Sequence, residues 1–178
     1  IPDIFTHVGL GTQVFKGTLV NDVLHFNLVC PLMQYKYSPA LNTNIWSNID
    51  DVPAFVDVNG DGDIDVLTYG TFGAFVEYYE NQTVEHAGDP SYDVDSFKFE
   101  NQTLCWGNFQ ESASSNAITL NVNCKGDGNS AQPTDGGARH AGATLYSFDA
   151  DHDHDVDLLI GNISYNTVAF AHNCGDSS

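Results

Sequence analysis

The chain has 178 residues and a formal net charge of −19, because 24 acidic side chains face only five Lys and Arg. This charge excludes nucleic acid and anionic membranes as favourable partners. Hydrophobic residues make up 42% of the chain, so its composition is that of a folded protein. No apolar run approaches the ~20 residues that a membrane-spanning helix needs, so we expect no membrane insertion.

The chain begins at Ile1 rather than Met, so we expect a mature or trimmed fragment. Residues 1–30 are rich in Val, Phe, Leu and Thr, which predicts strands over 12–15 and 23–29. Residues 31–53 carry three prolines and several Asn. This composition predicts an irregular connection.

Residues 57–65 carry oxygen-bearing side chains at alternate positions, which is too dense a cluster to bury without a counter-charge. Calcium takes about six to eight oxygens, and known loops supply them from positions 1, 3 and 5 and from the carbonyl at position 7. Gly62, at position 6, allows the sharp turn. The spacing predicts a calcium site formed by Asp57, Asn59, Asp61, the carbonyl of Asp63, and Asp65.

Strands are predicted on both sides of this loop and beyond it, over residues 54–56, 64–69, 74–80, 96–99, 103–109 and 117–122. The glycine-rich residues 125–142 predict an exposed loop, and they contain no phosphate-binding motif. No segment shows a helical period, so we predict an all-β fold.

The acidic pattern returns at residues 149–157 and predicts a second calcium site formed by Asp149, Asp151, Asp153, the carbonyl of Asp155, and Asp157. The flanking apolar residues recur at the same offset, which identifies an internal repeat. We expect a single all-β domain with three parts: N-terminal strands and a connection over 1–50, a first repeat with an insertion over 51–125, and a second repeat over 143–175.

Two histidines distinguish the second loop, because His152 and His154 stand where the first loop has glycines. A non-glycine residue with positive φ costs about 1 kcal/mol, so we predict weaker calcium binding at the second site. A transition metal is the alternative that the histidines suggest. The alternation, however, places both histidines off the ligand positions.

Four cysteines permit three disulfide pairings. Cys105 and Cys124 flank a short strand–turn–strand segment, which favours a local pairing. Cys30 and Cys174 are then left to join the two ends of the chain. The even cysteine count and the low Lys content predict a secreted or cell-surface protein.

N-glycosylation sequons occur at Asn81, Asn101 and Asn162, and they make a glycoprotein a further expectation. The sequence has no GxSxG or HExxH motif, and it has no carboxylate pair apart from the metal loops. We therefore expect no enzymatic activity.

Residues 53–67 resemble the FG-GAP/VCBS repeat. Residues 139–144, residues 158–166 and the segment Cys105-Trp106-Gly107 are similar to secreted repeat proteins of Bacteroidota. The resemblance covers residues 50–175 and implies four-stranded, β-propeller-like blades in which the calcium loop joins two strands. Such repeats occur in adhesins, integrin-like heads, lectins and enzyme-associated modules.

Two recognisable repeats do not close a propeller, which normally needs about four or more blades. The chain is then a piece joined to neighbouring domains, or it hides degenerate blades in residues 1–50 and 96–125. The third alternative is that its open sheet edges pair with another copy, even into a filament.

The leading expectation is a secreted, calcium-binding module with a structural, adhesive or surface-assembly role. A carbohydrate-binding module is the alternative, based on Tyr78, Tyr79 and Tyr165, and it would take glycans as partners. An accessory domain of a secreted hydrolase is the third.

Overall fold

The computed structural model describes residues 1–71, 73–89, 98–112, 115, 117–122 and 142–175. In these residues the regular elements are strands and one short 3-10 turn: β1 (Ile4–Val8), β2 (Gly11–Val20), β3 (Val23–Cys30), β4 (Gln34–Ser38), β5 (Leu41–Asn44), β6 (Ala54–Val56), β7 (Asp65–Tyr69), β8 (Val76–Asn81), β9 (Lys98–Thr103), η1 (Trp106–Asn108), β10 (Gln110–Glu111), β11 (Ile118–Thr119), β12 (Ala143–Phe148), β13 (Asp157–Asn162) and β14 (Val168–Ala171). Across the described ranges, no helix has the length and hydrophobicity that crossing a bilayer requires.

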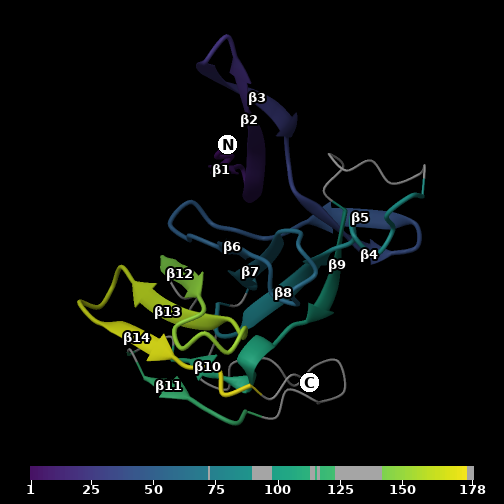
Figure 1. The fold of residues 1–178 in the computed structure, drawn as a ribbon. Coiled ribbons are helices and arrows are strands. Elements are labelled where there is room, and N and C mark those ends of the chain that lie inside the picture. Colours follow the sequence, from purple (N-terminus) through teal and green to yellow (C-terminus); the bar gives the residue numbers. More distant parts are fainter. Residues whose placement is uncertain (72, 90–97, 113–114, 116, 123–141, 176–178) are drawn as a thin grey trace.

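The strands form four open sheets, with the orders β1-β2-β3, β5-β4-β9-β8-β7-β6, β12-β13-β14 and β10-β11 (Figure 1). The predicted all-β fold is therefore confirmed. The propeller is not found in the described part of the chain, since its sheets remain open and do not close into a ring.

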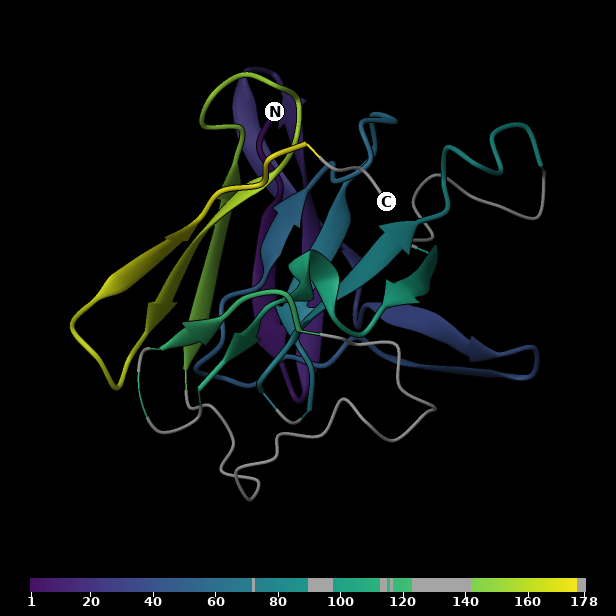
Figure 2. The ribbon, with the colours of Figure 1, turned by 90° about the horizontal axis from the view of Figure 1, so that it is seen from below.

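The six-stranded sheet is the middle layer of a three-layer stack, in which the other two layers are the β1–β3 and β12–β14 sheets (Figures 1 and 2). On one of its faces, Leu67 and Tyr78 pack with Leu158 of β13. On the other face, Val66 packs with Val14 of β2. Because successive side chains of a strand point to opposite faces, β7 contributes to both cores and is buried along its whole length.

Equivalent positions of the two repeats lie side by side where the middle sheet meets β12. Val52 N donates to the Ala143 carbonyl at 2.8 Å, and Leu145 N donates to the Val52 carbonyl at 2.9 Å, which makes a parallel bridge. The Asp51 carboxylate accepts from Ala143 N at 3.1 Å, across a separation of 92 residues. That separation equals the repeat offset. The two repeats also meet through unlike faces, because Leu67 packs with Leu158, which is the counterpart of Val66.

Most predicted strands are found, and two segments differ. Residues 31–53 contain the β4–β5 hairpin, not an irregular connection. Pro39 lies in the turn of this hairpin, where a residue without an N–H costs no ladder bond. Part of the predicted strand 103–109 is instead η1, since Gly107 adopts a φ of 72° that a strand does not allow.

The predicted Cys30–Cys174 disulfide is wrong, because both residues are free. Cys30 is buried in the core on one face of the middle sheet. Cys174 is exposed and follows β14, which belongs to the layer on the opposite face. The middle sheet thus separates the two thiols. Cys105 is disulfide-bonded, and its predicted partner Cys124 lies outside the described residues.

We expect Leu67→Ala to lower the free energy of unfolding by about 2–5 kcal/mol, because it opens a cavity in the core between the middle sheet and β12–β14. Leu41→Ala, in an exposed position on β5, is the matched control and should change the free energy of unfolding by less than about 0.5 kcal/mol. Denaturant titration measures both values. Equal losses for the two variants would contradict the three-layer core.

Candidate metal centres

The two acidic loops occupy the same place in the two repeats. The first connects β6 to β7, and the second connects β12 to β13. In both, the two strands joined by the loop pair antiparallel, so each loop closes a hairpin that contributes to the core between layers. The loop conformations are therefore tied to sheet packing.

The first aspartate of each loop binds the backbone of its own turn. Asp57 Oδ2 accepts a hydrogen bond from Gly62 N at 2.9 Å, and Asp149 Oδ2 accepts one from His154 N at 3.2 Å. Asp57 Oδ1 also accepts from Gly60 N at 2.7 Å. These bonds curl the loop back over its first residue.

Asp65, the last aspartate of the first loop, is fully buried. Its carboxylate accepts hydrogen bonds from Val58 N at 2.9 Å, from Asn81 N at 2.8 Å and from the Tyr78 hydroxyl at 3.2 Å. Burial outweighs these donors and raises the pKa of Asp65 to about 7. The residue joins the loop to β8, because Tyr78 and Asn81 belong to that strand.

Asp157 repeats this arrangement in the second loop. Its carboxylate accepts from Ala150 N at 2.8 Å and from Asn173 N at 2.7 Å. These partners lie 92 residues after those of Asp65, since Val58 corresponds to Ala150 and Asn81 to Asn173. The internal repeat is thus present in the hydrogen bonds as well as in the sequence.

Three groups of side chains in the described residues place ligand atoms within 4.8 Å of one another and could hold a metal ion. One lies at the first loop and two share Asp151 at the second: Asp61, Asp63 and Glu85; Asp149, Asp151 and Asp153; and Asp151, Asp157 and His172. Three predicted carboxylate ligands are not in these groups of acidic and histidine side chains: Asp57, Asp65 and Asp155. Asn59, an amide, instead donates to the Asp61 carboxylate at 2.9 Å.

Asp63 is placed differently from its prediction, which assigned it only a backbone carbonyl. Its side chain joins the first group, and its Oδ1 is buried without a hydrogen-bond partner in the described structure. Burial raises the pKa of Asp63, and the nearby carboxylates Asp61 and Asp57 raise it further. An orphaned carboxylate oxygen beside other carboxylates is the kind of atom that a cation satisfies.

In each repeat a side chain at the end of the third strand, Glu80 in β8 or His172 just after β14, reaches the loop. The Glu80 carboxylate accepts from Asn59 Nδ2 at 2.9 Å, whereas His172 Nε2 lies 2.9 Å from the Asp151 carboxylate. Glu80 and His172 are equivalent positions, and so are Asn59 and Asp151. In the first repeat the carboxylate is on the strand residue, whereas in the second repeat it is on the loop residue. The hydrogen bond to Asp151 raises the pKa of His172. Sequence reasoning missed both partners as well as Glu85, although the repeat offset aligned Glu80 with His172.

His152 and His154 adopt φ values of 67° and 76°, and the glycines at the same positions, Gly60 and Gly62, adopt 80° and 101°. The expected positive φ at position 6 is therefore present. Both histidines are exposed, so neither gains packing that would offset the backbone cost.

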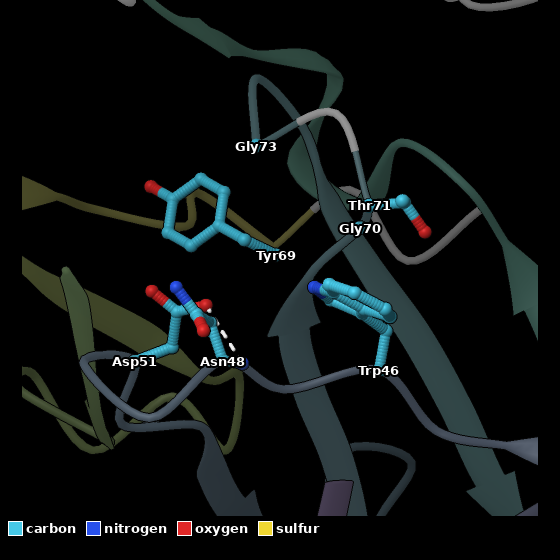
Figure 3. Close-up of a pocket in the computed structure, with 7 residues that line it drawn as sticks. All are labelled: Trp46, Asn48, Asp51, Tyr69, Gly70, Thr71 and Gly73. Atoms are coloured by element: carbon cyan, nitrogen blue, oxygen red, sulfur yellow. Dashed lines mark hydrogen bonds between the residues drawn. The ribbon is translucent and has the colours of Figure 1, made fainter. Parts of the chain in front are cut away.

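A small cavity of about 20 Å³ lies beside the joint between the repeats and is lined by Trp46, Asn48, Asp51, Tyr69, Gly70, Thr71 and Gly73 (Figure 3). Its volume accommodates about one water molecule, not a substrate. Asp51, which accepts from Asn48 N at 3.1 Å, holds the chain that pairs with β12. The cavity therefore belongs to the joint.

The tyrosines proposed for sugar binding and the asparagines of the sequons are mostly covered in the fold. Tyr78 and Tyr79 are 9% and 2% exposed, so strand packing accounts for them and neither offers a sugar-binding surface. Asn81 is buried, and its Nδ2 donates to the Ile64 carbonyl at 3.2 Å, which leaves no space for a glycan in the folded chain. Asn101 and Asn162 are half-buried.

No protein-family model, curated protein or solved structure matches this chain.

We expect His154→Gly to stabilise the protein by about 1 kcal/mol, because glycine adopts positive φ without the steric cost. Gly62→His is the reciprocal variant: a Cβ there meets no atom within 4 Å, so only backbone strain should appear, as a loss of about the same size. Thermal unfolding in chelator measures both. If both variants raised the melting temperature, or both lowered it, backbone strain at positive φ would not be the cause.

In chelator we expect the free energy of unfolding to decrease as the pH rises from about 4 to about 7. Folded Asp65 keeps its proton in this range while the unfolded carboxyl has lost it, so the proton is bound more tightly by the folded state. Denaturant titrations across this range measure the slope. Asp65→Asn, which has no proton to lose, should show a shallower slope, and an unchanged slope would contradict the assignment.

Proposed function

We propose that this chain is a secreted, calcium-binding β-repeat module with a structural or adhesive role. The observation that carries the proposal is the orphaned Asp63 Oδ1 within a group of three carboxylates. Packing does not explain such an atom, whereas a divalent cation supplies both a partner and a counter-charge.

The donor set favours calcium. In the first loop Asp61, Asp63 and Glu85 would hold the ion, and every donor is a carboxylate oxygen. Hard cations with flexible coordination suit such ligands. In the second loop the three aspartates Asp149, Asp151 and Asp153 form another all-oxygen group, in which only Asp153 corresponds to a member of the first group, Asp61. The imidazole of His172 belongs to an overlapping group that shares Asp151, and it leaves a transition metal as the alternative there.

Calcium bound at these loops would act through the hairpins. Each loop joins two strands whose apolar residues meet in the core between the middle sheet and β12–β14. An ion that fixes a loop therefore adds its binding free energy to that of folding. Two ions would also reduce the formal charge from −19 to −15, which lowers self-repulsion.

The resemblance to FG-GAP/VCBS repeats supports the same proposal. In the proposed reading, β6–β9 and β12–β14 are blade-like units that succeed one another at the 92-residue offset. Millimolar-range calcium sites suit an extracellular location, where they stay loaded.

We expect chelation to lower the melting temperature of the wild-type chain, because calcium stabilises only the folded loops. Asp61→Ala and Asp153→Ala should each remove one of two calcium ions in a calorimetric titration and reduce the effect of chelation. Asp50→Ala, at an exposed aspartate outside both loops, is the matched control and should leave two ions bound. A wild-type melting temperature that is the same in chelator and in calcium would refute the proposal.

A second candidate, glycan binding, rests on an open groove of about 460 Å³ lined by Tyr35, Lys36, Tyr37, Ser38, Pro39, Glu100, Asn101 and Leu104. The Tyr37 ring is well exposed, and Lys36 pairs with Glu100 at 3.6 Å beside it. An aromatic face next to hydrogen-bonding groups is suited to a sugar ring. Binding on a glycan array that is lost in Tyr37→Ala would favour this candidate, and an array without binding would remove it.

A further inference from the structure

The β1–β3 sheet has an apolar face on the side away from the middle sheet, which no other sheet covers, although Ile1 and Pro2 lie against it at Gly17. Pairing between its strands places six large apolar side chains on this face: Ile4, Phe15, Leu19, Leu24, Phe26 and Leu28. All but the half-buried Phe15 are at least 40% exposed. The opposite face carries Val14 and Cys30, which pack against the middle sheet. We call the uncovered surface the N face.

The β12–β14 sheet also has an uncovered apolar face, at the other end of the stack. Pairing places Tyr146 beside Leu159 and Phe170 on this side, while the opposite side carries the core residues Leu145 and Ile160. We call this surface the C face. It is defined by Tyr146, Phe148, Leu159, Val168 and Phe170.

The C face is an ordered aromatic surface. Ring centroids lie 5.8 Å apart between Tyr146 and Phe148, 5.9 Å between Phe148 and Phe170, and 6.0 Å between Phe170 and His172. Tyr146 is 62% and Phe170 is 52% exposed. A row of rings in contact with one another presents a flat surface that suits sheet-on-sheet packing.

The defining residues of the N face and the C face are all uncharged, although 24 acidic residues occur in the chain. The row of rings on the C face ends at His172, which pairs with Asp151. Taking roughly 200 Å² for a fully exposed large apolar residue, the exposed fractions give each face about 450 Å² of apolar surface. Such an area is within the range of about 300–600 Å² for the largest patch on a monomer, and two of them together approach the ~1,000 Å² of a specific interface.

The packing inside the chain indicates what covers these faces. Apolar sheet faces already stack twice within the molecule, on the two sides of the middle sheet. The two repeats also join at Val52 and Ala143. Inside the chain Leu67 packs with Leu158, the counterpart of Val66, so the two repeats meet through unlike faces. The C face is therefore expected to meet a face unlike itself, and the N face is the other apolar sheet face that no sheet covers.

We propose that two copies of this chain associate head to tail, with the N face of one packed on the C face of the next. The interface is heterologous, so a bound pair keeps one free face at each end and further copies add to it as a ring or a filament. The contact uses sheet faces rather than the sheet edges expected from the sequence. Its strength should increase with salt, because the highly charged copies repel and the two faces are uncharged.

Phe26→Asp alters only the N face, and Phe170→Asp alters only the C face. Each variant alone should lose self-association by about tenfold or more, because the contact would bury an unpaired carboxylate. An equimolar mixture should form a one-to-one dimer and stop there, since only the intact C face of Phe26→Asp and the intact N face of Phe170→Asp can meet. Sedimentation velocity of the 178-residue chain at high salt, with calcium present, measures all three.

Leu41→Asp is the control, because Leu41 is 55% exposed on β5 and belongs to neither face. It should associate as the wild type does. Circular dichroism checks that each variant is folded, and Leu24→Asp with Val168→Asp replaces the first pair if either variant is not.

Three results would each overturn the proposal: a wild-type chain that stays monomeric at the highest soluble concentration, assembly that survives both single substitutions, or a mixture that stays monomeric while the wild type associates. Calcium binding is measured separately by calorimetric titration. A failed association experiment therefore does not affect the proposed metal sites, and a failed calcium titration does not affect this interface.

Discussion

The structure depends on one buried carboxylate in each repeat. Asp65 and Asp157 are fully or almost fully buried. Each accepts hydrogen bonds from a backbone N–H of its own loop and from one at the end of, or just after, the third strand of its repeat. A carboxylate without such donors would not be tolerated at this depth. These bonds fix the distance between loop and sheet, and the rest of each acidic loop is built outward from them.

The acidic loops and the apolar core are therefore one system. The loop ends at the first residue of β7 or β13, and the next residues of those strands, Val66 and Leu158, are core residues. In each repeat a single residue, Asp65 or Asp157, lies between the charged loop and the residues that pack between layers. This short path explains why a cation at an exposed loop would stabilise a whole sheet, and why the loops of both repeats keep the same hydrogen bonds despite the strained histidines of the second.

Charge and hydrophobicity are segregated in this molecule. The candidate ligands gather in loops at the ends of hairpins, whereas the residues that define the N face and the C face are uncharged and apolar. A net charge of −19 keeps copies apart, and the two faces attract them once that charge is screened or neutralised. The proposed calcium sites and the proposed head-to-tail contact are thus physically compatible.

The sequence by itself determined the all-β fold, the internal repeat, the two acidic loops and the positive φ at position 6, because period and spacing are local properties of the chain. Tertiary structure alone decided which side chains reach the loops: Glu85 and His172 come from residues distant in the sequence. It also decided that the middle sheet separates Cys30 from Cys174 and that Tyr78 is covered. Burial on both faces of a strand depends on which sheets stack, and alternation within one strand does not encode that.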